Sequence, residues 1–152
     1  MSSPRNRGPR RADPHLLLLL SRGLFEYGQA IREGLLEHGF GDVPRSGSRL
    51  LATLSEAPAT VGELADTLRS TKQGVSRLSD AMVERGYLRR SSDRDDHRLV
   101  RLALTARGRS AAQSVFGAVA EVDRAIVRRA GKSGSARAQK ALAEVFGTPR
   151  QP

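Results

Sequence analysis

The sequence predicts a mainly α-helical fold with one small β-hairpin, and three observations lead to this prediction. Hydrophobic residues make up 38% of the 152 residues, with four Phe, two Tyr and no Trp, so a core of Leu, Val and Ala is expected, which favours helices. Apolar residues recur every three or four positions towards both ends of the chain. Within residues 87–104, two short strand-like segments flank a charged run. The length suggests one domain with appended segments.

A long amphipathic helix is expected near the start of the chain. Asp13 can cap it, and Pro14 suits the first helical position. Apolar or small residues spaced by three and four then form one seam: Leu17, Leu20, Leu24, Tyr27, Ile31 and Gly34. The pattern ends at His38 and Gly39, which predicts a helix of about six turns.

A shorter helix, roughly residues 45–56, should follow a loop that ends at Pro44. Its apolar side would be buried, and Pro58 would stop it. The residues expected in the core are Leu50, Leu51 and Leu54.

Two helix-start signals then stand ten residues apart. Thr60 and Glu63 fit one capping box, and Ser70 and Gln73 fit another. This separation leaves room for a helix of about two turns, a tight turn and a second helix, which is the spacing of a helix-turn-helix. The second helix should end just before Gly86, because glycine suits the left-handed position after a helix.

The second helix of this pair has two distinct faces. One face is apolar or small: Gly74, Val75, Leu78, Ala81 and Met82. The other face is polar: Lys72, Gln73, Ser76, Arg77 and Asp80. Amide, guanidinium, ammonium and hydroxyl groups are those that contact base edges and phosphates. Gly74 is expected to face inward and to let the two short helices pack closely.

A β-hairpin is predicted directly after this helix. Residues 87–90 and 99–104 read as strands, and Leu102 and Leu104 share one face with Val100 by the period-two rule. The run between the strands, residues 91–97, is almost entirely polar or charged. A helix-turn-helix followed by a charged hairpin predicts a winged helix, with the charged run as the tip of the wing.

A last helical region should begin at Thr105 and carry an apolar stripe to Ile126. The pattern breaks at residues 131–135 and resumes weakly as far as Phe146. The stripes of the first and last helices are not explained by a winged-helix core, so they predict a homodimer joined by the terminal helices. The expected organisation is a flexible basic arm, an N-terminal dimerisation helix and loop, a winged helix and C-terminal dimerisation helices, at residues 1–13, 14–44, 45–105 and 106–152.

The charge distribution predicts a polyanionic partner. The formal net charge is +10 and the pI is near 11.4, which favours nucleic acid first and an anionic membrane surface second. Residues 69–109 hold eleven Lys or Arg against five acidic residues, a net of +6. Residues 14–68 hold four against seven, a net of −3. The basic excess therefore peaks at the predicted recognition helix and wing, where a phosphate backbone should bind.

Several classes of protein are disfavoured. The chain has no Cys, so disulfides, thiolate catalysis and Cys-based zinc sites are excluded, and a cytoplasmic location is expected. The five-leucine run Leu16–Leu20 is far shorter than the roughly 20 apolar residues of a membrane span, and no signal peptide is recognised. No catalytic Ser, His and acid spacing and no Gly-rich phosphate loop stand out. We therefore expect no enzyme and no cofactor.

The residue types of the wing tip alone would allow a metal site there. The candidates are Asp93, Asp95, Asp96 and His97. The calcium-loop spacing fails, since the sixth position counted from Asp93 is Arg98 rather than Gly, and the twelfth is Leu104 rather than Glu. No metal is therefore expected.

Several sequence blocks together resemble the MarR family of bacterial transcription regulators. They are Gly62-Glu63-Leu64-Ala65, residues 71–78, Glu84-Arg85-Gly86-Tyr87-Leu88, and Asp96-His97-Arg98 followed by residues 104–108. The last block is similar to the family's Asp-x-Arg wing signature with Leu-Thr-x-x-Gly after it. The resemblance implies a dimeric winged-helix protein on pseudo-palindromic promoter DNA, usually a repressor.

The resemblance also implies which residues meet DNA, with the recognition helix in the major groove and Arg98 of the wing in the minor groove. Asp96 would hold Arg98 or a neighbouring Arg in place. Arg94 stands where the family often has Pro, and His97 where it often has Arg or Lys. The expected DNA-binding residues are Thr71, Lys72, Gln73, Ser76, Arg77, Arg89, Arg90, Arg94 and Arg98. Of these, Arg77, Gln73 and Ser76 are expected to contact bases, and Lys72, Arg89 and Arg90 mainly phosphates.

A small-molecule effector is implied by the resemblance alone. Its pocket would lie between the dimerisation helices and the winged helix, near Phe25, Phe40, Leu50 and Leu54. The family's peroxide-sensing branch relies on a reactive Cys, so thiol oxidation cannot be the signal here. An aromatic acid, a drug-like amphiphile or no ligand at all stay open.

Two other functions remain as alternatives. One is a sequence-tolerant architectural DNA-binding protein, for which the net charge of +10 alone would suffice. The other is a module that uses the winged helix for protein contacts. Binding without sequence preference would favour the first, and the absence of DNA binding would favour the second.

Overall fold

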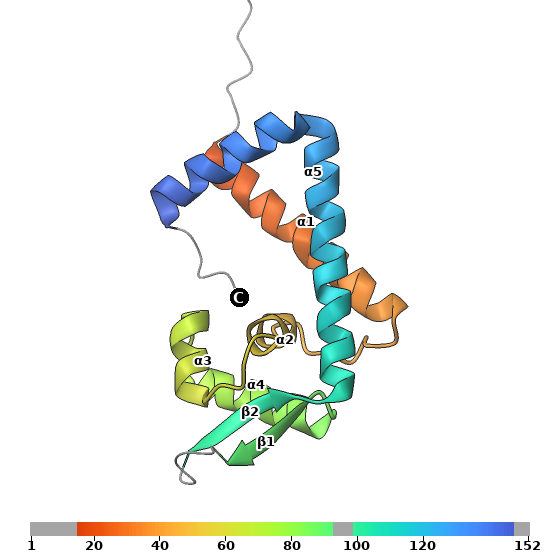
Figure 1. Cartoon of the computed structure of the whole chain (residues 1–152), viewed down its shortest axis with the longest axis vertical. Helices are drawn as coiled ribbons and strands as arrows, with labels where there is room; N and C mark the ends of the chain where they lie inside the picture. Colours follow the sequence, from red (N-terminus) through yellow and green to blue (C-terminus); the bar gives the residue numbers. More distant parts are fainter. Residues whose placement is uncertain (1–14, 93–98, 148–152) are drawn as a thin grey trace, which may run out of the picture.

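The predicted fold class is confirmed by the computed structural model of the chain, which describes residues 15–92 and 99–147. Helices and a single hairpin follow one another in the predicted order (Figure 1). The elements are α1 (Leu16–Glu37), α2 (Gly47–Leu54), α3 (Val61–Leu68), α4 (Lys72–Glu84), β1 (Leu88–Ser92), β2 (Val100–Leu104) and α5 (Ala106–Phe146). The helices α2, α3 and α4 and the hairpin form a winged helix at one end of the molecule, and α1 and the distal part of α5 lie at the other end.

The core of the winged helix is built from α2, α3, α4 and the hairpin. Its most deeply buried apolar side chains include Leu50, Leu51, Leu64, Met82 and Leu102, each 0 or 1% exposed. The first turns of α5 close this core with Ala111, Ala112 and Val115. The three leucines expected in the core from the helix near residues 45–56 are therefore confirmed as core residues.

The two short helices of the helix-turn-helix begin differently from one another. Thr60 and Glu63 form the predicted capping box: Glu63 N donates to Thr60 Oγ1 at 3.2 Å, and Thr60 N donates to Glu63 Oε2 at 2.7 Å. The second box, Ser70 with Gln73, is wrong. The N-cap of α4 is Thr71, whose Oγ1 accepts a hydrogen bond from Gly74 N at 3.1 Å.

The inner face of α4 is also partly different from the prediction. Val75 and Met82 are buried as expected, at 2% and 0% exposed. Gly74 is exposed, and a Cβ built there would lie nearest to Thr71 Oγ1, at 3.0 Å, so Gly74 serves the cap and not a close crossing with α3. Ser79 lies in the core instead, 1% exposed, and its hydroxyl has no partner among the described residues.

The wing is an antiparallel pair of strands with an extra connection to the helix-turn-helix. Leu88 pairs with Leu104 and Ser92 with Val100. Ala59, just before α3, forms a bridge to Leu102, with hydrogen bonds of 3.1 and 2.8 Å in the two directions. The base of the wing is therefore held to the start of α3 by backbone hydrogen bonds.

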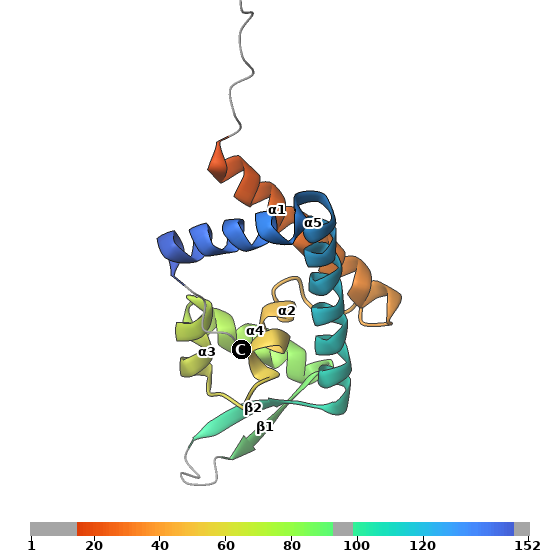
Figure 2. The same cartoon turned by 45° about the horizontal axis from the view of Figure 1, so that its top comes forward.

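The helix α5 bends where the sequence pattern breaks. Gly131 has φ 73° and ψ 160°, outside the helical region, and glycine adopts such a conformation most readily. Both views show that, beyond the bend, the distal part of α5 turns towards the side of the molecule where α1 begins (Figures 1 and 2). The predicted break in the last helical region is confirmed.

The long helices α1 and α5 pack against each other. A Cβ at Gly34 would lie 3.3 Å from Ala118 Cβ, which shows how closely they cross, and the Tyr27 hydroxyl donates to Asp123 Oδ1. Burial raises the pKa of the Tyr27 hydroxyl to about 12, with Asp123 as a further cause. Other apolar side chains of α1 are not covered in the single chain: Leu17 and Leu24 of the seam are 71% and 75% exposed, and the neighbouring Phe25 is 63% exposed. Within the described residues, no helix is long and apolar enough to cross a membrane.

Candidate nucleic-acid interface

The outer face of α4 carries polar side chains that are not used within the chain. Lys72, Gln73 and Arg77 are exposed, and Ser76 is half-buried. Within residues 15–92 and 99–147, none of these four side chains has a hydrogen bond or an ion pair, in contrast to Asp80 on the same helix. Their donors and acceptors are therefore available to an external partner.

The start of α4 adds a favourable electrostatic feature. Thr71 caps the helix with its hydroxyl, and no acidic residue lies in the first turn. The unpaired N–H groups and the helix dipole give such an end a partial positive charge. Lys72, the first residue of the helix, adds a full positive charge there. An anionic group such as a DNA phosphate suits this end.

The two arginines of β1 differ in availability. Both are exposed, but the guanidinium of Arg90 is paired with the carboxylate of Asp80, so it is already partly neutralised. Arg89 has no side-chain partner in the part of the chain that the structure describes. Sequence reasoning placed Arg89 and Arg90 together and missed the ion pair, because residues 80 and 90 lie on different elements.

The tip of the wing, residues 93–98, lies outside the described residues, as does the basic arm of residues 1–13. This includes Arg94 and Arg98, expected to bind DNA, and Asp96, expected to support them. The alternative of a metal site at Asp93, Asp95, Asp96 and His97 falls in the same segment. Among the residues that are described, no group of His, Asp and Glu could hold a metal ion.

The wing is fixed to α3 by a side-chain contact that sequence reasoning also missed. Arg101 of β2 donates to Glu63 Oε2 and to the carbonyl oxygen of Pro58, both at 3.2 Å. The same Glu63 oxygen accepts the hydrogen bond from Thr60 N in the capping box. Glu63 therefore joins the start of α3 to the wing and fixes these two parts relative to each other.

A polar cluster connects the winged helix to the first turn of α5 and to the loop after α1. We call Asp42, Tyr87 and Arg107 the Asp42 cluster. The Tyr87 hydroxyl donates to Asp42, and Arg107 Nη2 donates to Asp42 Oδ1 at 3.0 Å, to Asp42 Oδ2 at 3.1 Å and to the Tyr87 hydroxyl oxygen at 3.0 Å. The Arg107 guanidinium lies 4.6 Å from the centre of the Tyr87 ring, a cation–π distance. Phe40 meets the same ring edge to face, with centroids 6.2 Å apart.

The Asp42 cluster alters the acidity of its members. The hydrogen bond from Tyr87 lowers the pKa of the Asp42 carboxyl, and the positive charge of Arg107 adds to this effect. Burial raises the pKa of the Tyr87 hydroxyl, and the hydrogen bond to Asp42 raises it further. Asp42 is therefore held as an anion and Tyr87 as a neutral donor. Tyr87 and Arg107 each lie in one of the sequence blocks that resemble the MarR family, but the three residues are far apart in sequence, so no local signal showed that they would meet.

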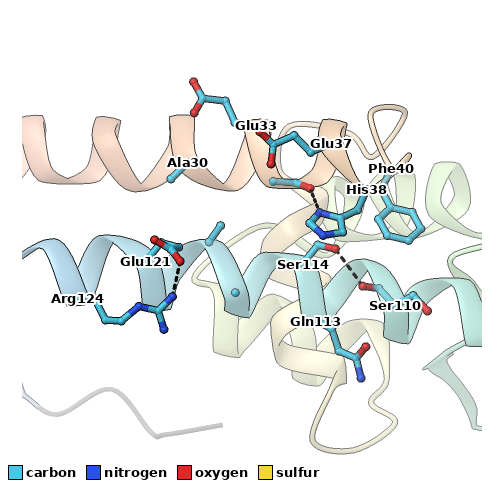
Figure 3. A pocket seen from close by; sticks show the side chains of 13 residues that line it. Ala30, Glu33, Glu37, His38, Phe40, Ser110, Gln113, Ser114, Glu121 and Arg124 are labelled. Carbon is cyan, nitrogen blue, oxygen red and sulfur yellow. Dashed lines mark hydrogen bonds and ion pairs between the residues drawn. The ribbon is translucent and has the colours of Figure 1, made fainter.

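A groove of about 760 Å³ lies between α1 and α5 (Figure 3). Its charged lining is mainly acidic, with Glu33 and Glu37 from α1 and Glu121 from α5 against Arg124. Phe40, one of the four expected effector-pocket residues, lines this groove. The Glu121–Arg124 ion pair on one wall is drawn as a dashed line in Figure 3.

The other three expected pocket residues lie elsewhere. Phe25 lines a separate groove of about 280 Å³ between α1 and the segment that leads into α2. Leu50 and Leu54 line neither groove; they are 0% and 4% exposed and belong to the core. Both side chains therefore pack in the core of the single chain, and their place in an effector pocket stays a prediction.

Comparison with known proteins places this geometry among transcription regulators. Residues 42–99 match a model of the MarR family. The chain is similar to the structure of MarR from E. coli in its apo form, with 20% identity, a TM-score of 0.67, and coverage of 90% of this chain and 98% of that one. It is similar to RV1404 from Mycobacterium tuberculosis, with 26% identity, a TM-score of 0.72, and coverage of 90% and 92%. A probable transcriptional regulator from Pseudomonas aeruginosa has 21% identity, a TM-score of 0.69, and coverage of 89% and 99%. No curated protein sequence matches.

Proposed function

The chain belongs to the MarR family of transcription regulators, which bind DNA and are not enzymes, and from this premise we propose that it is a sequence-specific repressor. In this proposal it acts in the cytoplasm, binds pseudo-palindromic promoter DNA as a homodimer, and is released by a small ligand. The observation that carries the proposal is the outer face of α4, where Lys72, Gln73, Ser76 and Arg77 have no partner among the described residues.

The chemistry of this face supports sequence-specific recognition of DNA. The Arg77 guanidinium can donate two hydrogen bonds to the major-groove edge of guanine, and the Gln73 amide can pair with adenine. Lys72 at the start of α4 and Arg89 on β1 suit phosphates, because each carries a charge without an intramolecular ion pair in the described part of the chain. We propose that the guanidinium of Arg90 contacts a phosphate while it stays paired with Asp80, so that its positive charge is divided between the two partners. We also propose that Arg98 enters the minor groove, that Arg94 binds DNA from the tip of the wing, and that Asp96 holds Arg98 or a neighbouring Arg in place.

The exposed apolar surface supports the proposed homodimer. Leu16, Leu17, Leu18 and Leu19 at the start of α1 are between 51% and 71% exposed, and Val145 and Phe146 at the end of α5 are 75% and 64% exposed. Burying such a surface is favourable by about 25 cal/mol per Å² of apolar area. A second copy would cover both ends and place two α4 helices in successive major grooves, about 34 Å apart.

The groove between α1 and α5 is the proposed effector site. Because Glu33, Glu37 and Glu121 line it, a neutral or cationic amphiphile suits it better than an aromatic acid, whose carboxylate would meet like charges. A ligand bound there would favour a dimer whose half-site spacing does not match the operator. Titration of such compounds against the preformed DNA complex tests this part of the proposal.

Selection of genomic DNA fragments by the purified protein, in about 150 mM salt, tests the function itself. The enriched duplexes would then be titrated against scrambled duplexes by fluorescence anisotropy. We expect a palindromic winner bound at least about a thousandfold more tightly than scrambled DNA. Uniform affinity with a steep salt dependence would support an architectural protein instead, and absence of DNA binding would support a protein-interaction module.

A further inference from the structure

We propose that the Asp42 cluster is a positioning element that fixes the tilt of the winged helix on α5 and so sets the half-site spacing that the dimer accepts. The inference rests on the proposed function, because spacing has meaning only for a dimer on paired half-sites. Asp42, Tyr87 and Arg107 would touch neither DNA nor ligand. They would act through the orientation of α4 and the wing.

The three residues of the cluster come from three different parts of the fold. Asp42 lies in the loop between α1 and α2, Tyr87 lies between α4 and β1, and Arg107 lies in the first turn of α5. The hydrogen bonds and the ion pair of the cluster therefore join the segment that follows the recognition helix to the loop after α1 and to the first turn of α5. A change in the tilt of α5 at this point would be passed directly to α4 and β1.

The backbone at the same point has little conformational freedom. Tyr87 O accepts hydrogen bonds from Thr105 N at 3.0 Å and from Thr105 Oγ1 at 3.1 Å. A Cβ at Gly108 would lie 2.1 Å from that same oxygen, so the first turn of α5 rests directly on the backbone of Tyr87. These contacts hold the first turn of α5 against the backbone of Tyr87, and the side chains of the Asp42 cluster meet at the same point.

The charged pair of the cluster lies where an ion pair stabilises the fold only weakly. The side chains of Asp42 and Arg107 are each 47% exposed, and ion pairs at such positions contribute little to the free energy of folding. The geometry is nevertheless specific: Arg107 contacts both carboxylate oxygens and also lies against the Tyr87 ring. A contact that adds little to the free energy of folding but has a defined geometry is suited to fixing the angle between the winged helix and α5.

The test uses the full chain and the duplex enriched by genomic selection, together with versions whose centre is lengthened or shortened by one or two base pairs. The variants are Arg107→Gln, Asp42→Asn and Tyr87→Phe, of which the last removes only a hydroxyl and keeps the ring against Phe40. The control is Arg22→Gln, which removes the same charge from an ion pair within α1, Arg22 with Glu26 at 3.4 Å. Melting temperature and active fraction are measured for every variant.

We expect the unmodified chain and Arg22→Gln to lose about tenfold or more in affinity when the centre changes by one base pair, a discrimination of the size of one weak base contact. The three cluster variants should lose only about threefold or less, while their melting temperatures stay within a few degrees of the unmodified chain. The double variant Asp42→Asn with Arg107→Gln should match either single variant, because the residues act as one unit.

A cluster variant whose spacing profile runs parallel to that of the unmodified chain would overturn the inference, even if its affinity were lower. A merely structural role predicts that result, because partial unfolding lowers the active fraction equally on every duplex. If the variants of Asp42 and Arg107 do not fold, the spacing profile of Tyr87→Phe alone tests the inference. Failure to enrich any duplex would overturn the proposed function and this inference together, whereas an enriched duplex with unchanged spacing profiles would overturn this inference alone.

Discussion

Replacing Gly108 by Ala is expected to destabilise the protein, although the general effect of this substitution in a helix is the opposite. Gly108 lies in the first turn of α5 and is buried, with ordinary helical backbone. Alanine is the better helix former by up to about 1 kcal/mol. Helix propensity alone therefore predicts a more stable protein, so the sign of the effect tests the packing.

The magnitude follows from the contact with Tyr87. A Cβ at Gly108 would lie 2.1 Å from Tyr87 O and 3.1 Å from Tyr87 C, whereas ordinary contacts begin near 3.4 Å. The backbone must therefore separate by more than an ångström, which strains the hydrogen bonds from Thr105. Overpacking of this kind costs about 1–3 kcal/mol. After the gain in helix propensity is subtracted, we expect the free energy of unfolding to fall by roughly 1–2 kcal/mol, which lowers the melting temperature by about 2–8 °C.

Thermal and urea unfolding, followed by circular dichroism without DNA, measure this effect. The matched control is Gly62→Ala in α3, where a Cβ would meet nothing closer than 3.8 Å. The control should be neutral or up to about 1 kcal/mol more stable. If Gly108→Ala were as stable as the unmodified chain while the control behaved as expected, the close contact between α5 and Tyr87 would be wrong.

Three further predictions concern single side chains. Thr71→Ala removes the N-cap of α4 and should cost about 1 kcal/mol of stability, with weaker DNA binding; a change below about 0.3 kcal/mol in urea unfolding would contradict the cap. Ser79→Ala removes a buried hydroxyl without a partner and should be neutral or stabilising by up to about 1 kcal/mol, so clear destabilisation in the same assay would reveal a missed hydrogen bond. Because the pKa of Asp42 is lowered in the folded state, its contribution should be complete above about pH 5 and should fade as the pH drops through the folded pKa. The difference in melting temperature between the unmodified chain and Asp42→Asn should therefore shrink on acidification, and a constant difference would speak against the ionised pair.

Local sequence signals predicted the helices, the α3 cap and the bend well, because each depends on a few neighbouring residues. The capping box at Thr60 and Glu63 uses residues three positions apart, and glycine at the bend needs only its own backbone freedom. The start of α4 shows the limit of such rules. Ser70 fits the box, but Ser70 N donates to Ala65 O at 2.9 Å and Arg69 is left-handed at φ 50°, so Ser70 completes the end of α3 and Thr71 becomes the cap.

Contacts between distant segments could not be predicted in this way. Asp42, Tyr87 and Arg107 meet only because three elements converge, and no spacing rule connects them. The expected pocket residues show the same limit. Periodicity identified Leu50 and Leu54 as apolar, but only the packed structure shows that both side chains are buried in the core.

The most direct test of the central claim, that the outer face of α4 reads DNA sequence, compares Arg77→Ala with Lys72→Ala on the selected and scrambled duplexes over a range of salt. Arg77→Ala should lower the ratio of the two affinities by about fivefold to a hundredfold, the effect of about 1–3 kcal/mol for a base contact. Lys72→Ala should weaken both complexes equally and lower the salt slope by about one. An unchanged affinity ratio for Arg77→Ala would contradict the claim that this face of α4 reads bases.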